Sequence, residues 1–61
     1  MERQMLLDEK LNKLNDSYVA LLDHKSNGDL RRVIGEFHSI IDYAYEGMYI
    51  TETILNQEGE G

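Results

Sequence analysis

The tetrapeptide Ser-Asn-Gly-Asp at residues 26–29 decides the fold, because it separates two long segments that are patterned as helices. Gly28 can adopt the left-handed backbone conformation that closes a helix, and Asp29 can cap the helix that follows. A connection this short holds its flanking helices side by side and antiparallel. The sequence therefore predicts a turn over residues 26–29 between two antiparallel helices.

The segment before the turn repeats apolar residues at alternating steps of four and three, a spacing that keeps one face of a helix apolar. These residues are Leu7, Leu11, Leu14, Tyr18 and Leu21. Asn15, Asp16 and Ser17 are weak helix formers that could start a second, separate helix. Because the apolar repeat passes through them in phase, we predict one continuous helix over residues 2–25.

The segment after the turn carries the same kind of repeat. Its members are Leu30, Ile34, Phe37, Ile41, Ala44, Met48 and Leu55. We predict a second helix over residues 30–55, which completes a two-helix domain over residues 1–55. Residues 56–61 are polar, acidic and glycine-containing, so we expect a flexible acidic tail there.

The two apolar repeats match each other in register. Facing residues of an antiparallel hairpin have position numbers with a constant sum, and the pairs Leu21 with Ile34 and Leu7 with Met48 both give 55. Half of that sum falls inside the predicted turn. The sequence therefore predicts an all-α fold, an antiparallel helical hairpin whose seam consists of these two repeats.

The second predicted helix has a further apolar stripe that this seam does not use. It consists of Val33, Ile40, Tyr43, Gly47, Ile50 and Ile54, about 80–100° round the helix from the seam. A lone hairpin would leave this stripe exposed, so we predict that it is the interface with a second copy or another partner. Two hairpins packed with Gly47 near a two-fold axis would form a four-helix bundle. Alternatively, Gly47 is a tolerated helix glycine that costs about 1 kcal/mol.

In length, short turn and acidic glycine-containing tail, the chain resembles the dimeric helical hairpins of the Rop type. The resemblance concerns architecture and implies a four-helix bundle of two copies. The basic RNA-facing surface of such proteins is not apparent here, since 12 acidic residues outweigh 6 basic ones and give a net charge of −6. We therefore expect neither direct nucleic-acid binding nor binding to anionic membranes.

Catalysis and cofactor binding are not expected. A chain of 61 residues without Cys is too small to surround a catalytic cleft. His38, Ser39 and Asp42 have the residue types of a hydrolase triad, but neighbours on one helix diverge by about 100°. His38, Asp42 and Glu46 would bind a metal ion only weakly from one exposed helix. We predict a non-enzymatic protein without a cofactor, metal or small-molecule ligand.

A second candidate surface lies on the outer side of the second predicted helix. Tyr45 and Tyr49 are four residues apart and so lie side by side, bordered by His38, Asp42 and Glu46. Aromatic side chains fringed with carboxylates suit a target protein with a basic or partly apolar surface. The alternative is that both tyrosines cover the edge of the hairpin seam.

These features favour a small acidic regulator that binds proteins through its second helix, as an inhibitor, antirepressor or chaperone-like adaptor. Its partners would be a second copy of itself and a target protein. The size favours a bacterial or phage source, and the lack of an apolar segment of membrane-spanning length or a signal-peptide pattern favours a cytoplasmic location. Two alternatives are a DNA mimic that inhibits a nucleic-acid-binding protein through its carboxylates and a structural subunit of a larger helical assembly.

Overall fold

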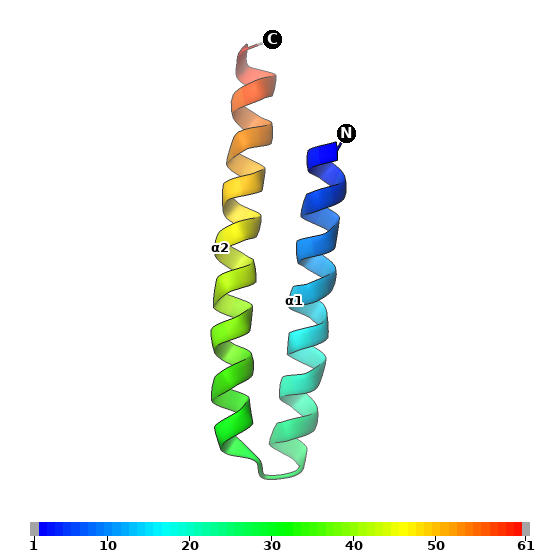
Figure 1. The fold of residues 1–61 in the computed structure, drawn as a ribbon, viewed down its shortest axis with the longest axis vertical. Coiled ribbons are helices and arrows are strands. Elements are labelled where there is room, and N and C mark those ends of the chain that lie inside the picture. Colours follow the sequence, from blue (N-terminus) through cyan, green and yellow to red (C-terminus); the bar gives the residue numbers. More distant parts are fainter. Residues whose placement is uncertain (1, 61) are drawn as a thin grey trace.

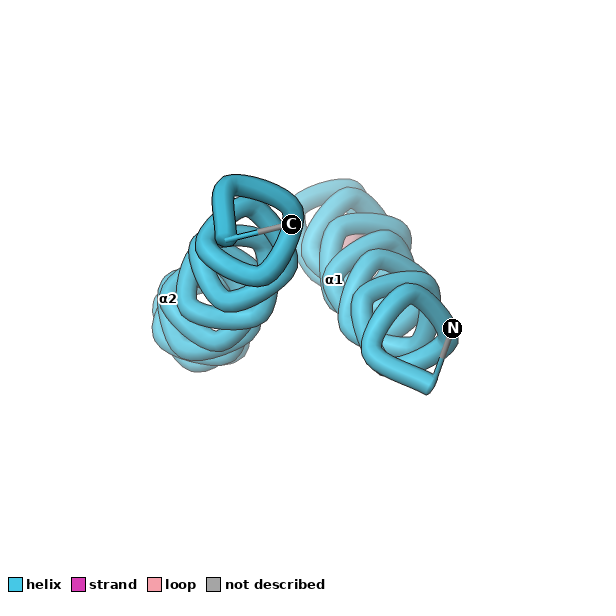
Figure 2. The backbone as a smooth tube through the Cα atoms, turned by 90° about the horizontal axis from the view of Figure 1, so that it is seen from above, coloured by secondary structure: helices cyan, strands magenta, loops and turns pink. Residues whose placement is uncertain are grey.

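Two long helices form an antiparallel hairpin in the computed structural model, which describes the backbone of residues 2–60 and the side chains of residues 2–57 (Figure 1). Helix α1 spans Glu2–Ser26 and helix α2 spans Leu30–Glu60. The two helices lie side by side along their length, with both chain ends at the same end of the molecule. Viewed along the hairpin, they form two neighbouring columns (Figure 2). The predicted helical hairpin is confirmed.

The turn closes α1 with a Schellman motif at Gly28, whose φ is 75°. The Gly28 N–H donates to the Lys25 carbonyl at 3.1 Å, and the Asp29 N–H donates to the His24 carbonyl at 2.9 Å. Asp29 then caps α2, because its Oδ1 accepts a hydrogen bond from the Arg32 backbone N–H at 3.4 Å. Both predicted roles, the left-handed glycine and the capping aspartate, are confirmed.

The helices are slightly longer than the sequence predicts. Helix α1 is continuous through Asn15–Ser17, as predicted, and ends at Ser26. Helix α2 continues past Leu55 to Glu60, so the predicted tail over residues 56–61 is helical as far as Glu60, while Gly61 lies outside the described residues. The chain contains no proline, and extending an existing helix adds one backbone hydrogen bond for each residue that is ordered.

The helices pack through a face of α2 that differs from the predicted seam. A Cβ placed on Gly47 would lie 3.9 Å from Leu7 Cδ1 of α1, and Lys10 Nζ lies 2.8 Å from Glu46 Oε2. The half-buried residues of α2 include Val33, Glu36, Ile40, Tyr43, Gly47, Ile50 and Ile54. Apart from Glu36, these residues are the stripe predicted to be left exposed by a lone hairpin. That prediction is wrong, because the hairpin itself covers the stripe.

Six of the seven α2 residues predicted to form the seam are exposed instead, and the seventh, Ala44, is half-buried. Leu30, Ile34, Phe37, Ile41, Met48 and Leu55 are 49–64% exposed. On α1, Leu11 and Tyr18 of the predicted seam are also more than half exposed, whereas Leu21 is buried. Helix α2 is therefore rotated by about 100° about its own axis relative to the prediction. The predicted register is nearly kept, because Leu7 and Gly47 have a position sum of 54 rather than 55.

The hairpin alone has very little core. Among residues 2–57, Leu21 is the one buried apolar side chain and Ser17 the one buried polar side chain. Every other large apolar residue of this part of the chain keeps some contact with solvent. Packing of the two helices against each other therefore buries only part of their apolar surface.

Neither helix, over the described residues, is long and apolar enough to cross a membrane.

Candidate interaction surface

Nine of the fourteen exposed large apolar side chains of residues 2–57 lie on one side of the hairpin, which we call the open apolar face, whereas Met5, Leu6, Val19, Tyr45 and Tyr49 lie outside it. It consists of Leu11, Tyr18 and Leu22 of α1 and of Leu30, Ile34, Phe37, Ile41, Met48 and Leu55 of α2. The α2 members lie roughly 100° round the helix from the residues that contact α1. Because Leu11 of α1 lines the same groove as Ala44 and Met48 of α2, the two sets lie on the same side. The open apolar face therefore spans both helices.

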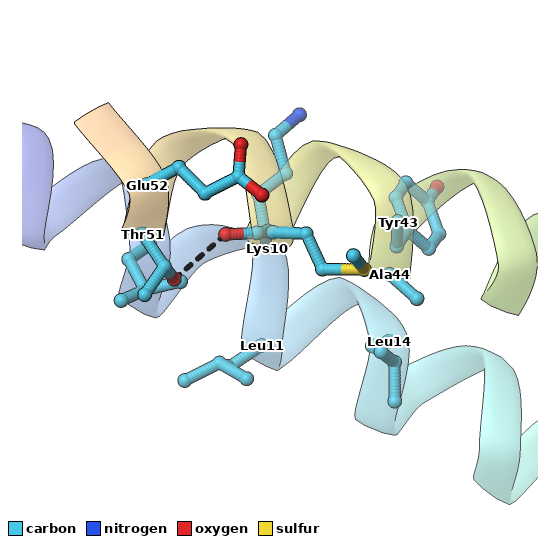
Figure 3. Close-up of a pocket in the computed structure, with 10 residues that line it drawn as sticks. Lys10, Leu11, Leu14, Tyr43, Ala44, Thr51 and Glu52 are labelled. Atoms are coloured by element: carbon cyan, nitrogen blue, oxygen red, sulfur yellow. Dashed lines mark hydrogen bonds between the residues drawn. The ribbon is translucent and has the colours of Figure 1, made fainter. Parts of the chain in front are cut away.

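A groove of about 390 Å³ lies between the helices at this face (Figure 3). Its lining residues are Leu7, Lys10, Leu11, Leu14, Tyr43, Ala44, Gly47, Met48, Thr51 and Glu52. The groove exists because Gly47 has no side chain and Ala44 has a short one, which leaves the space beside Leu11 unfilled. Thr51 Oγ1 donates a hydrogen bond to the Gly47 carbonyl at 2.8 Å, so this hydroxyl is satisfied within α2. The lining is thus mainly apolar and suited to side chains of another helix.

Polar contacts also link the two helices. Lys10 points away from Leu11 (Figure 3), and its Nζ donates a hydrogen bond to Glu46 Oε2 at 2.8 Å. This hydrogen bond, helped by the charge of Glu46, raises the pKa of Lys10 against the opposing effect of desolvation. His24 Nε2 and Glu36 Oε2 lie 3.5 Å apart in a second contact between the helices.

The predicted outer surface on α2 is largely exposed. Tyr45 and Tyr49 are 67% and 72% exposed, and His38 and Asp42 are exposed beside them. Glu46 is different, because it is engaged by Lys10 across the hairpin. The two tyrosines therefore do not cover the edge of the seam, which was the alternative interpretation.

Each tyrosine borders a shallow hollow. Tyr45 lies beside Ile41 and Met48 and so adjoins the open apolar face. Tyr49 lines a different hollow, beside Arg3 and Leu6 of α1. The pair thus connects the open apolar face with the outer side of the hairpin.

The described side chains offer no grouping of three His, Asp or Glu residues that could hold a metal ion. Of the three residues with triad chemistry, His38 and Asp42 are exposed and Ser39 is half-buried. They occupy one helix, where His38 and its neighbour Ser39 diverge by about 100°.

Sequence analysis missed two features of this surface. The first is the Lys10–Glu46 ion pair, whose position sum of 56 is close to the predicted register and could have indicated it. The second is the groove at Gly47, since a glycine in line with an apolar stripe marks a place where packed helices leave room. Both features depend on which side of α2 faces α1.

Comparisons with known proteins give one informative relative. No protein-family model matches the sequence. A protein of Bacillus subtilis strain 168, described as SPbeta prophage-derived uncharacterized protein YopV, is 65% identical over 54 residues, which cover 88% of this chain and 84% of the relative. No solved structure matches the chain.

Proposed function

The chain belongs to the family of the prophage-derived protein YopV, and we propose that it is a small acidic regulator that acts by binding proteins through the open apolar face. The exposure of this face carries the proposal. Nine large apolar side chains lie on one side of the hairpin, whereas Leu21 is the one apolar side chain that is buried among residues 2–57. Contiguous apolar surface of this extent on a small protein usually marks an association site.

In its resting form the protein is a homodimer, in which two hairpins cover their open apolar faces and form a four-helix bundle. Two observations support this form. The exposed α2 residues of this face are spaced by four, three, four, seven and seven residues, which keeps them on one side of the helix as helix packing requires. The groove beside Leu11 also offers room for side chains of a second hairpin.

The regulator acts by masking part of a target protein. The target packs on the open apolar face after the dimer opens, or it binds the outer surface of the dimer at Tyr45 and Tyr49. Exposed Asp42 and Glu52 lie on the same helix as these tyrosines, so a basic or partly apolar target is favoured. The prophage origin of the relative supports action on a bacterial or phage protein in the host cytoplasm.

Sedimentation equilibrium of the pure chain, together with helicity as a function of concentration, tests the dimer. We expect a species of about twice 7.1 kDa that loses helix as dilution separates the copies. Affinity capture with the dimer as bait, compared with Phe37→Asp and Tyr49→Asp baits, then tests target binding. A compact monomer at all concentrations would contradict the proposal.

A DNA mimic is the second candidate, because the exposed carboxylates Asp42 and Glu52 belong to a chain with a net charge of −6. Carboxylates that replace phosphates would bind a basic cleft with an affinity that falls steeply as salt is added. Binding through the open apolar face would instead tolerate salt. A salt titration of target binding distinguishes the two candidates, and a chain that is helical only with a different partner would favour the third, a structural subunit.

A further inference from the structure

We infer that the two copies pair head to tail, with the turn of one hairpin beside the chain ends of the other. In this arrangement α2 packs against α2 of the second copy about a two-fold axis between residues 42 and 43. The inference rests on the proposed dimer and adds its orientation and register. This axis replaces the two-fold axis predicted near Gly47, because Gly47 faces α1 within the hairpin.

The distribution of charge along the hairpin favours this orientation. Residues 21–40, which surround the turn, hold three acidic and three basic side chains, so this half is neutral. The other half holds nine acidic and three basic side chains and therefore carries the whole net charge of −6. If the turns lay at the same end, the two charged halves would repel each other. Head-to-tail pairing instead places each charged half beside a neutral half that contains Lys25, Arg31 and Arg32.

The spacing of the α2 residues in the open apolar face gives the register of the dimer. The α2 positions on this side are symmetric about the point between residues 42 and 43, because 30 with 55, 37 with 48, 41 with the half-buried Ala44, and 34 with Thr51 each sum to 85. Antiparallel pairing of two α2 helices about this point places Phe37 opposite Met48 of the second copy. It also places Ile41 opposite Ala44 of the second copy, so that a large side chain meets a small one. The short side chain of Ala44 thus lets the two α2 helices approach each other closely next to the axis.

The open apolar face is large enough for a stable dimer. Its members on α2 run from Leu30 to Leu55, a length of about 38 Å at ~1.5 Å per residue. Each of its nine side chains exposes roughly 100 Å² of surface to solvent. Together they match the ~800 Å² of surface that each partner buries in a standard interface. A second copy can therefore cover the face without any other protein.

One introduced thiol tests the orientation, because the chain contains no cysteine. Asn27→Cys places a single spin label at the exposed turn of each copy, and pulsed electron paramagnetic resonance measures the distance between the two labels. Head-to-tail pairing predicts about 45 Å, twice the helix rise from residue 27 to the two-fold axis. Pairing with the turns together predicts less than about 25 Å.

A label at Asp42→Cys is the matched control, because this position lies next to the proposed axis and should give a distance below about 25 Å in the dimer. Sedimentation of both labelled proteins shows whether a dimer forms, independently of how its copies are oriented. A dimer with a short distance between the two labels at position 27 overturns the head-to-tail orientation and leaves the proposed function standing. A monomer overturns both.

Discussion

Gly28 and Gly47 are the two glycines at which the fold depends on the missing side chain, and they do so for different reasons. Gly28 has a φ of 75°, which L residues with a side chain rarely adopt. Gly47 has ordinary helical geometry and lies opposite Leu7, where it sets the depth of the groove. The first glycine is needed for backbone conformation, whereas the second only leaves space.

Replacement of Gly28 should destabilise the turn. Gly28→Ala places a Cβ on a left-handed backbone, which costs about 1 kcal/mol of the free energy of unfolding. Gly35→Ala is the control, because Gly35 lies within α2 and a Cβ there meets nothing within 4 Å. Urea unfolding followed by circular dichroism should show a loss for Gly28→Ala and a gain of roughly 0.5–1 kcal/mol for Gly35→Ala. Equal effects would contradict the Schellman assignment.

Gly47→Ala should stabilise the hairpin. Its new Cβ would lie 3.9 Å from Leu7 Cδ1, an ordinary contact, while alanine is a better helix former than glycine by about 1 kcal/mol. The free energy of unfolding should therefore rise, as measured by urea titration at fixed protein concentration. A marked loss of stability would mean that α1 approaches α2 more closely than this distance.

At the scale of the elements, the sequence allowed the turn, the first residue of each helix and nearly the register to be predicted, because each depends on local chemistry, whereas α2 ends at Glu60 rather than at Leu55. Gly28 and Asp29 act on their own backbone, and counting residues from the turn fixes which layers meet. The packing face of α2 could not be predicted in the same way. Ile40 and Ile41 belong to two stripes that are both apolar and lie about 100° apart, so hydrophobicity does not choose between them.

The same ambiguity explains why the candidate interface was predicted on the wrong side of α2. The interface predicted on the Ile40 stripe is covered by α1, and the open apolar face consists of residues predicted to be the seam. The side-by-side placement of Tyr45 and Tyr49 was predictable from their spacing within one helix, whereas their exposure was not, because coverage of the seam edge was an open alternative. Selection between two apolar stripes needs the three-dimensional fit of Gly47 against Leu7, which spacing does not reveal.

Two neighbouring isoleucines distinguish the two stripes experimentally. Ile40→Asp places a carboxylate against α1 and should cost about 1–3 kcal/mol of hairpin stability. Ile41→Asp places the same group on the open apolar face and should leave the hairpin helical while it weakens dimerisation. Circular dichroism below the dimer dissociation constant should show the greater loss of helix for Ile40→Asp. The reverse order would restore the predicted seam.

The contact between Lys10 and Glu46 predicts a dependence on pH. The folded-state pKa of Lys10 is raised above 10.5, so the contribution of the pair is fully present below that value and is lost as the pH rises through the folded-state pKa. The difference in melting temperature between the natural chain and Lys10→Met should therefore be constant well below pH 10.5 and shrink as the pH rises above 10.5. An unchanging difference would contradict the ion pair.

For the whole molecule, the hairpin combines three regions with different chemistry. The open apolar face lacks a cover, polar contacts such as that of Lys10 with Glu46 link the two helices, and the outer side presents Tyr45 and Tyr49. Leu21 is the one buried apolar side chain among residues 2–57. The protein therefore depends on the open apolar face for most of its further apolar burial. Folding and association are thus expected to be coupled.

Phe37 provides the sharpest test of this coupling, because it lies in the middle of the open apolar face and is 52% exposed in the hairpin. Phe37→Asp would bury a carboxylate at the dimer interface and should raise the dimer dissociation constant at least ~100-fold, since central aromatic residues commonly contribute more than 2 kcal/mol. Tyr49→Asp introduces the same charge on the same helix but on the outer side, so sedimentation equilibrium should find its dimer intact. If both variants dissociate equally, added negative charge rather than loss of the apolar contact explains the effect, and the open apolar face is not the interface.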